Sequence, residues 1–175
     1  MKRLLSILAL IAILTVSLTS CGLTVPRPEV KEGRFNLSVT YEINGKVDTL
    51  SAVYVCEFDG TSFTLEGGNF TRAWKDHVEG DYEGDDYSAI VGTTDDGGNV
   101  TVFFGVYPEY FMGDPEMGDR GIPEPSIYVN YPENEYGEST HVGDPFDVAA
   151  LYGAKIISYE YDAPIKNSFS KFDFN

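Results

Sequence analysis

A strict alternation of apolar and polar side chains over residues 34–43 constrains the fold more than any other feature of the chain. One side of this segment is apolar and the other is polar: Phe35, Leu37, Val39, Tyr41 and Ile43 against Asn36, Ser38, Thr40 and Glu42. A period of two residues is typical of a β-strand with one buried face. Asn44-Gly45 follows, a dipeptide that accepts the positive φ angles of a type I′ turn. The segment therefore predicts a hairpin whose second strand runs over about 46–58.

Further short strands joined by turn-forming residues are expected along the rest of the chain. Asp59-Gly60 predicts a second tight turn, after which a third strand would run over 61–65. Later strands are expected over four segments: 87–93, 99–107, 126–131 and 156–161. Residues 69–78 stay ambiguous between helix and strand, because their large apolar side chains recur every four positions over a short stretch.

One short helix is expected near the C-terminus, over residues 144–153. Asp144 suits the N-cap, Pro145 the first helical position and Gly153 the position just past the last turn. Many strands with tight turns and a single short helix indicate a mainly β chain. We therefore expect one β-rich domain over 34–175, built as an antiparallel β-sandwich or as an open barrel.

The N-terminus has the pattern of an export signal. Lys2 and Arg3 precede an apolar run that ends at Leu18, too short for a membrane-spanning helix. The following residues, Leu18-Thr19-Ser20-Cys21, resemble the lipobox of bacterial lipoproteins. In that family the cysteine takes a diacylglyceryl group, and the signal is cut just before it. The resemblance implies a signal peptide over 1–20, a lipidated Cys21 and a domain on the extracytoplasmic face of the cell membrane. Residues 22–33 hold two prolines and show little periodicity, so a lipidated tether is expected over 21–33.

The charge of the chain narrows the choice of partner. It holds 28 Asp and Glu against 12 Lys and Arg, a formal net charge of −16. Nucleic-acid binding depends on cations placed against phosphates, so no nucleic-acid partner is predicted. An acidic surface steers basic partners, so a basic protein is one candidate and an envelope polymer is the other. Because an anionic bilayer repels an acidic domain, the domain is expected to stand off the membrane, attached by its lipid alone.

Catalytic and metal-binding motifs are incomplete in this sequence. Cys56 lies among apolar residues with acidic neighbours, where a buried and unreactive thiol is expected. No catalytic residue, metal or cofactor is therefore predicted. A small envelope hydrolase with two facing carboxylates stays the alternative, because the chain is rich in acids and none stands out. Two acidic loops hold candidate calcium ligands: Asp81, Glu83, Asp85 and Asp86 in the first, and Asp95, Asp96 and Asn99 in the second. Neither loop has the usual calcium-binding motif, so ordinary solvated turns are favoured over calcium sites.

A long segment without periodicity, residues 108–126, is the candidate recognition loop. It holds four prolines and three glycines. Loops of this length in compact domains are often functional, and aromatic and methionine side chains anchor partners in interfaces. The candidate partner-binding residues at its start are Tyr107, Tyr110, Phe111 and Met112. In the alternative interpretation the loop folds back and these side chains complete the core.

Several segments of the body carry a second resemblance. They are residues 55–60 (VCEFDG), 107–114 (YPEYFMGD), 157–160 (ISYE) and 164–169 (PIKNSF). With these segments the chain resembles uncharacterised lipoproteins of anaerobic Gram-positive bacteria. The resemblance implies an extracytoplasmic location and a single compact domain. That group has no assigned activity, so it implies no functional residue. The function expected is a membrane-anchored binding or accessory module.

Overall fold

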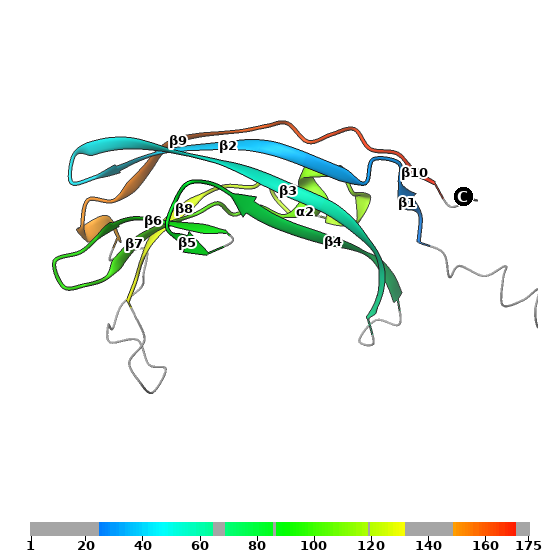
Figure 1. Cartoon of the computed structure of the whole chain (residues 1–175), viewed down its shortest axis with the longest axis horizontal. Coiled ribbons are helices and arrows are strands. Elements are labelled where there is room, and N and C mark those ends of the chain that lie inside the picture. Colours follow the sequence, from blue (N-terminus) through cyan, green and yellow to red (C-terminus); the bar gives the residue numbers. More distant parts are fainter. Residues whose placement is uncertain (1–24, 65–68, 86, 119, 132–148, 171–175) are drawn as a thin grey trace, which may run out of the picture.

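A computed structural model of the chain describes residues 25–64, 69–85, 87–118, 120–131 and 149–170. The fold is mainly β, as predicted, and the strand pairs are antiparallel. One four-stranded sheet has the order β4-β3-β2-β9, a second has the order β5-β6-β7-β8, and β1 pairs with β10. Two separate sheets share one core, so the architecture is sandwich-like (Figure 1).

The first sheet is long and the second is short. The first consists of β2 (Glu32–Ile43), β3 (Lys46–Thr64), β4 (Asn69–Glu79) and β9 (Lys155–Tyr161). The second consists of β5 (Gly84–Asp85), β6 (Ser88–Thr93), β7 (Asn99–Phe103) and β8 (Ser126–Asn130). The remaining elements are β1 (Arg27–Pro28), β10 (Phe169–Ser170), the one-turn helix α2 (Pro108–Phe111) and the 3-10 helix η1 (Pro115–Met117). Within the described residues, no helix is long and apolar enough to cross a bilayer.

The hairpin predicted from residues 34–58 is confirmed. Ile43 pairs with Lys46 around Asn44 and Gly45, whose φ angles are 50° and 81°. Both central residues of a type I′ turn need positive φ, which is why this dipeptide stands here. The apolar side of β2 faces the core, where Leu37 and Val39 are fully buried. The alternation in the sequence therefore fixes which face of the long sheet is covered.

The prediction of a turn at Asp59-Gly60 is wrong. β3 continues through Thr64, and the pairing with β4 shifts register between Phe58 and Gly60. Gly60 has a φ of 100°, which a β-bulge accepts as readily as a turn does. The segment expected as a separate third strand, 61–65, thus belongs to β3 up to Thr64.

The ambiguous segment 69–78 is a strand, β4. Positions four apart share a face in a strand as they do on a helix, so the spacing of its large apolar residues fits both. Exposed Lys75 and His77 alternate with inner-face Trp74, Asp76 and Val78. This alternation of exposed and inner-face residues has a period of two, which is that of a strand.

The folded domain begins earlier than the predicted start at residue 34. β1 pairs with β10, so that Arg27 lies opposite Ser170 and Pro28 opposite Phe169. Pro28 is fully buried, and β2 already begins at Glu32. Residues 27–33 are therefore part of the domain and do not belong to the tether that was expected over 21–33.

The C-terminal helix is described only in its last turn. Residues 149–151 are helical, whereas the predicted cap at Asp144 and Pro145 lies outside the described residues. Gly153 has a φ of 63°, and its N–H donates to the carbonyl of Ala150 at 3.0 Å. The N–H of Ala154 donates to the carbonyl of Ala149 at 2.9 Å, which completes a Schellman motif. Gly153 thus ends the helix as predicted.

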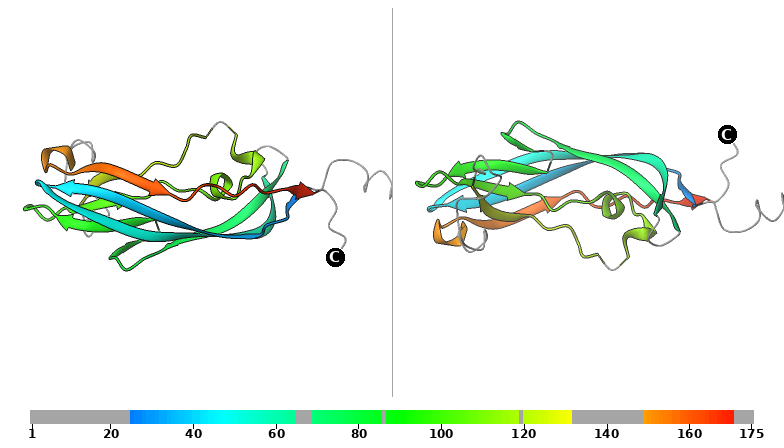
Figure 2. Two further views of the ribbon diagram at one scale, coloured as in Figure 1. Left: turned by 90° about the horizontal axis from the view of Figure 1, so that it is seen from above. Right: turned by 90° about the horizontal axis from the view of Figure 1, so that it is seen from below.

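A different part of the chain packs against each half of the long sheet. The short sheet packs under the half that carries the β2–β3 hairpin, whereas the loop with α2 and η1 packs under the other half (Figure 1). Buried residues of this loop join the core, among them Phe104, Phe111 and Met112. β1 and β10 lie at the far end of that second half, beside the free ends of β3 and β4 (Figure 2).

Candidate functional site

The structure buries two of the four residues proposed to bind a partner. Phe111 and Met112 are 0% exposed, so neither can contact a partner in this structure. The ring of Phe111 lies 4.8 Å from that of Phe35 and 5.2 Å from that of Tyr54. The loop folds back through the single turn of α2, because burying the three consecutive large side chains of residues 110–112 against the adjacent apolar sheet removes their apolar surface from water. The alternative interpretation, in which these residues complete the core, is confirmed for both.

Tyr107 and Tyr110 are half-buried and lie on different sides of the loop. Tyr107 faces a groove beside β4, and the guanidinium of Arg120 lies 5.6 Å from the centre of its ring. Its hydroxyl is buried and has no hydrogen-bond partner among the described residues. Tyr110 lines a separate hollow on the side of β9, together with Tyr159 and Tyr161. The structure therefore keeps only Tyr107 of the predicted set in the groove described next.

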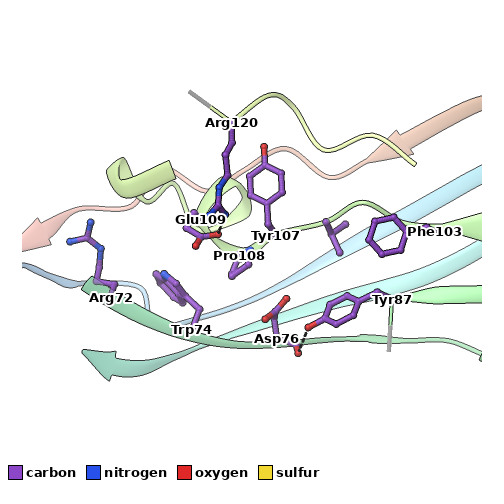
Figure 3. A pocket seen from close by; sticks show the side chains of 10 residues that line it. Arg72, Trp74, Asp76, Tyr87, Phe103, Tyr107, Pro108, Glu109 and Arg120 are labelled. Carbon is purple, nitrogen blue, oxygen red and sulfur yellow. Dashed lines mark hydrogen bonds and ion pairs between the residues drawn. The ribbon is translucent and has the colours of Figure 1, made fainter. Parts of the chain in front are cut away.

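An open groove of about 430 Å³ separates β4 from the segment that leads into α2. We call it the β4 groove and define it by its lining: Arg72, Trp74, Asp76, Tyr87, Phe103, Val106, Tyr107, Pro108, Glu109 and Arg120. Figure 3 shows the side chains of β4 along one wall and those around Tyr107 along the other. Aromatic rings and charged groups thus line the same space.

Alternation along β4 supplies the first wall. Arg72, Trp74 and Asp76 are two residues apart, so they point to the same inner face of the sheet. The loop that carries α2 covers this face further along, and the groove is the part that it leaves open. The wall was missed in the sequence because residues 69–78 stayed ambiguous. The signal that identifies it is the alternation of exposed Lys75 and His77 with these three residues.

A buried ion pair fixes one end of the groove. Arg72 donates to Asp114 twice, from Nε at 2.7 Å and from Nη2 at 2.6 Å, and both side chains are almost inaccessible. Asp114 also accepts from Trp74 Nε1 at 2.9 Å, and Glu116 binds Arg72 Nη2 at 3.0 Å. We call these residues the Arg72 cluster: Arg72, Trp74, Asp114 and Glu116. The cluster orients the indole of Trp74 at the groove.

The Arg72 cluster also shifts the pKa of its carboxylate. Burial alone would raise the pKa of Asp114. Hydrogen bonds from Arg72, from the backbone N–H of Glu116 and from Trp74, together with the charge of Arg72, hold that pKa below its usual value. Asp114 is thus held as a carboxylate.

Tyrosine hydroxyls hold Asp76, in the middle of the wall. The hydroxyl of the fully buried Tyr54 donates to Asp76 Oδ2 at 2.5 Å, and the hydroxyl of Tyr87 donates to the Asp76 carbonyl at 3.0 Å. Burial, the nearby thiol of Cys56 and the bond to Asp76 raise the pKa of Tyr54 far above its usual value. Tyr54 therefore stays a neutral donor that positions Asp76.

Cys56 is buried behind this wall, as predicted. It is 0% exposed, and burial raises the pKa of its thiol to about 12. The hydroxyl of Tyr54 lowers that pKa and the carboxylates of Asp76 and Glu109 raise it, both by less than burial does. At neutral pH the thiol is protonated and shielded, which is the opposite of what a nucleophile needs.

We expect Cys56 to resist thiol reagents in the folded protein. At pH 8 almost none of the thiol is ionised, and no reagent reaches it, so labelling with a chromogenic disulfide should proceed only after unfolding in urea. The measurement is the rate of thiol release with and without urea on a Cys21→Ala variant, in which Cys56 is the only cysteine. Rapid labelling of the native variant would contradict the burial.

The opposite wall pairs its charges in the same way. Glu109 Oε2 lies 3.2 Å from Arg120 Nη1, at the first turn of α2. Both arginines that line the groove are therefore paired with a carboxylate, Arg72 with Asp114 and Arg120 with Glu109, whereas Asp76 accepts a hydrogen bond from Tyr54. Such a surface offers flat apolar rings beside donors and acceptors, which suits the binding of a polar ligand with apolar faces.

In the second loop considered for calcium, the carboxylate of Asp96 accepts hydrogen bonds from neighbouring hydroxyls. Asp96 accepts from Thr94 Oγ1 at 2.5 Å and from the hydroxyl of Tyr131 at 3.1 Å. The bond from Thr94 lowers the pKa of Asp96, and those from Tyr152 and Tyr131 lower it further, against the effect of burial. Among the described residues, no group of three or more acidic, His or Cys side chains is placed to hold a metal ion. Asp86 lies outside these residues.

No protein-family model matches the chain, and neither a curated protein nor a solved structure matches it.

Proposed function

We propose that the chain is a lipid-anchored binding module on the extracytoplasmic face of the cell membrane, and that its β4 groove holds a segment of an envelope polymer. One observation carries the proposal: Trp74, Tyr87, Phe103 and Tyr107 line a single open groove together with ion-paired charged groups. Flat rings pack against the apolar faces of sugar units, and the charged groups beside them hydrogen-bond sugar hydroxyls.

The balance of charge favours a polymer without net charge. Arg72 and Arg120 are each paired with a carboxylate, so an anionic ligand would have to break an existing ion pair. The chain as a whole carries a net charge of −16, which repels anionic polymers at long range. A neutral glycan meets neither obstacle.

The N-terminus supports the anchor. The lipobox resemblance assigns the lipid to Cys21, and the described domain begins at Val25. Lipid on Cys21 would hold the groove at the membrane, where envelope polymers are assembled. A double-chain anchor of this type binds a bilayer firmly.

Glu109 and Asp76 support a second candidate, the envelope hydrolase. Both carboxylates line the β4 groove, as the two acids of a glycosidase must. Each is already engaged, however: Asp76 accepts from Tyr54, and Glu109 pairs with Arg120. The groove is therefore better suited to binding than to proton transfer.

The test uses Trp74, which is the only tryptophan of the chain and lies in the groove. The soluble fragment 22–175 is titrated with neutral envelope oligosaccharides, and tryptophan emission is recorded. We expect a saturable change, and an affinity at least about tenfold lower for Tyr107→Ala, since a central aromatic contact contributes more than 1.4 kcal/mol. Val47→Ala, at the opposite end of the sheet, is the matched control and should bind as the wild type does.

The other outcomes identify the other candidates. An emission spectrum that stays unchanged with every oligosaccharide would contradict the proposal that the β4 groove binds an envelope polymer. Binding that appears only with a basic protein, and that weakens with salt, would assign the acidic surface to a protein partner instead. Release of shorter glycans during the titration, lost in Glu109→Gln, would establish the hydrolase.

A further inference from the structure

Two phenylalanines at the free ends of β3 and β4 are exposed side by side. Phe63 and Phe70 pair directly across the two strands, and their ring centres lie 5.0 Å apart. Phe63 is 50% exposed and Phe70 is 38% exposed. The strands extend past the loop that covers the inner face of the long sheet, so neither ring belongs to the core cluster. The two adjacent rings thus form a small exposed apolar patch.

The chain that leads to Cys21 leaves the domain beside this pair. Arg72 lies two residues from Phe70 on the same face of β4, which is about 7 Å along a strand. The same Arg72 donates to the carbonyl of Pro26 at 3.1 Å and lies 4.7 Å from the ring centre of Phe169. Figure 2 shows β1 and the free ends of β3 and β4 at one end of the molecule in both views. The pair and the N-terminal exit thus share one end.

The distance from Cys21 to this end is short. Pro26 follows Cys21 by five positions, and five residues span at most about 18 Å when fully extended. A flexible chain of that length averages roughly 12 Å between its ends. The headgroup region of a bilayer is itself several ångströms deep on each side. An anchor at Cys21 therefore keeps the Phe63–Phe70 end within reach of the lipid surface.

We propose that Phe63 and Phe70 form a second, reversible contact with the bilayer, which holds the long sheet with its β3–β4 end toward the membrane. This inference rests on the lipid anchor of the proposed function. The anchor makes the second contact intramolecular, so a small apolar surface is sufficient to populate it. The rest of the acidic domain gains nothing from the lipid surface. The contact is therefore confined to this end, and the β4 groove, which starts at Arg72, lies next to the membrane.

The structure provides a clean way to measure this contact. Cys56 is fully buried and Cys21 is consumed by the lipid, so a cysteine introduced on the surface is the labelled one. Ser62→Cys places an environment-sensitive fluorophore next to Phe63 and leaves both rings in place. Val47→Cys places the same fluorophore at an exposed site at the opposite end of the long sheet. Both full-length lipidated variants are reconstituted in phosphatidylcholine vesicles with and without a quencher lipid labelled near the headgroup.

If Phe63 and Phe70 contact the bilayer, the fluorophores at positions 62 and 47 should be quenched to different extents. We expect the quencher lipid to reduce emission from position 62 at least about twofold and to leave position 47 nearly unchanged. Adding Phe63→Ser with Phe70→Ser to the Ser62→Cys variant should remove the quenching. The single Phe63→Ser change should remove part of it. Both rings are exposed, and unchanged thermal unfolding of these variants confirms that the fold is kept.

Two other results would overturn the inference. Equal quenching at positions 62 and 47 means that the domain moves freely on its tether, and quenching that persists without both rings means that they are not the contact. Flotation with vesicles, compared between wild type and Cys21→Ala, is measured first. If the wild type does not float, both the proposed lipid anchor and the proposed second contact are wrong. If the wild type floats but the fluorophore at position 62 is not quenched, only the proposed second contact is wrong.

Discussion

Replacing Asp114 with alanine is expected to lower the free energy of unfolding by about 3–5 kcal/mol, because the change leaves a buried guanidinium without its partner. The side chain of Arg72 is 3% exposed and that of Asp114 is 0% exposed. Asp114 also accepts the Trp74 indole N–H, which would lose its bond as well. Urea unfolding at pH 7, followed by circular dichroism, measures the loss.

An exposed ion pair of similar geometry is the control. Arg34 binds Glu79 at 2.6 Å, but their side chains are 60% and 45% exposed. Water screens such pairs, so Glu79→Ala should lower the free energy of unfolding far less than Asp114→Ala does. Equal losses for Asp114→Ala and Glu79→Ala would show that the Arg72 cluster is not the stabilising contact described above. Restoring packing with Arg72→Met and Asp114→Leu together should recover much of the loss.

The pH dependence of stability follows from the lowered pKa of Asp114. A carboxyl whose pKa is lower in the folded state stabilises the fold above its unfolded pKa, which is about 3.9. That contribution is lost as the pH falls through the folded-state pKa. The difference between wild type and Asp114→Asn should therefore be largest near pH 7 and shrink below about pH 4. A difference that is constant from pH 7 to pH 3 would contradict this assignment.

Phe111→Ala is expected to cost about 3–5 kcal/mol, the usual range for emptying a fully buried phenylalanine site. Its ring contacts those of Phe35, Tyr54, Tyr110 and Tyr161. Removing it takes away the main apolar contact that holds the covering loop against the long sheet. Most domains have a stability of 5–15 kcal/mol, so this one substitution removes a large part of it. Urea unfolding gives the value.

The matched control lies in the same loop. Ile122 is 68% exposed, so Ile122→Ala should change the stability by no more than about 0.5 kcal/mol. A small effect of Phe111→Ala would mean that the loop is not held by its aromatic side chain. A protein that unfolds readily but still binds ligand would separate the role of the loop in stability from that of the groove in recognition.

Local patterns predicted the parts of the fold that are decided locally. The β2–β3 hairpin follows from ten alternating residues and an Asn-Gly turn, and the helix end at Gly153 follows from one conformational preference. The buried state of Cys56 follows from its apolar neighbours. In these places the nearest residues in sequence determine the outcome.

Partners far apart in the sequence decided the rest. Asp59-Gly60 is compatible with a turn or a bulge, and pairing with the whole length of β4 selects the bulge. The candidate site depends on the same kind of contact, because Arg72 meets Asp114 across 42 residues. No local pattern marks a pair of that separation. For the same reason the sequence left Phe111 open between partner binding and the core: the sheet that buries it is formed by residues 32–64 and 69–79.

The pairing of β1 with β10 has a consequence for how the chain matures. Residue 27 is among the first of the domain to be synthesised and residue 170 is among the last, yet they lie opposite each other. Synthesis proceeds from the N-terminus, so this closure waits until β10, the last described strand of the domain, has been made. Until then the pocket for Pro28 is incomplete, and Arg72 lacks the aromatic ring of Phe169. Chains cut short by even the last ten residues of the described part should leave this end of the domain open to proteases.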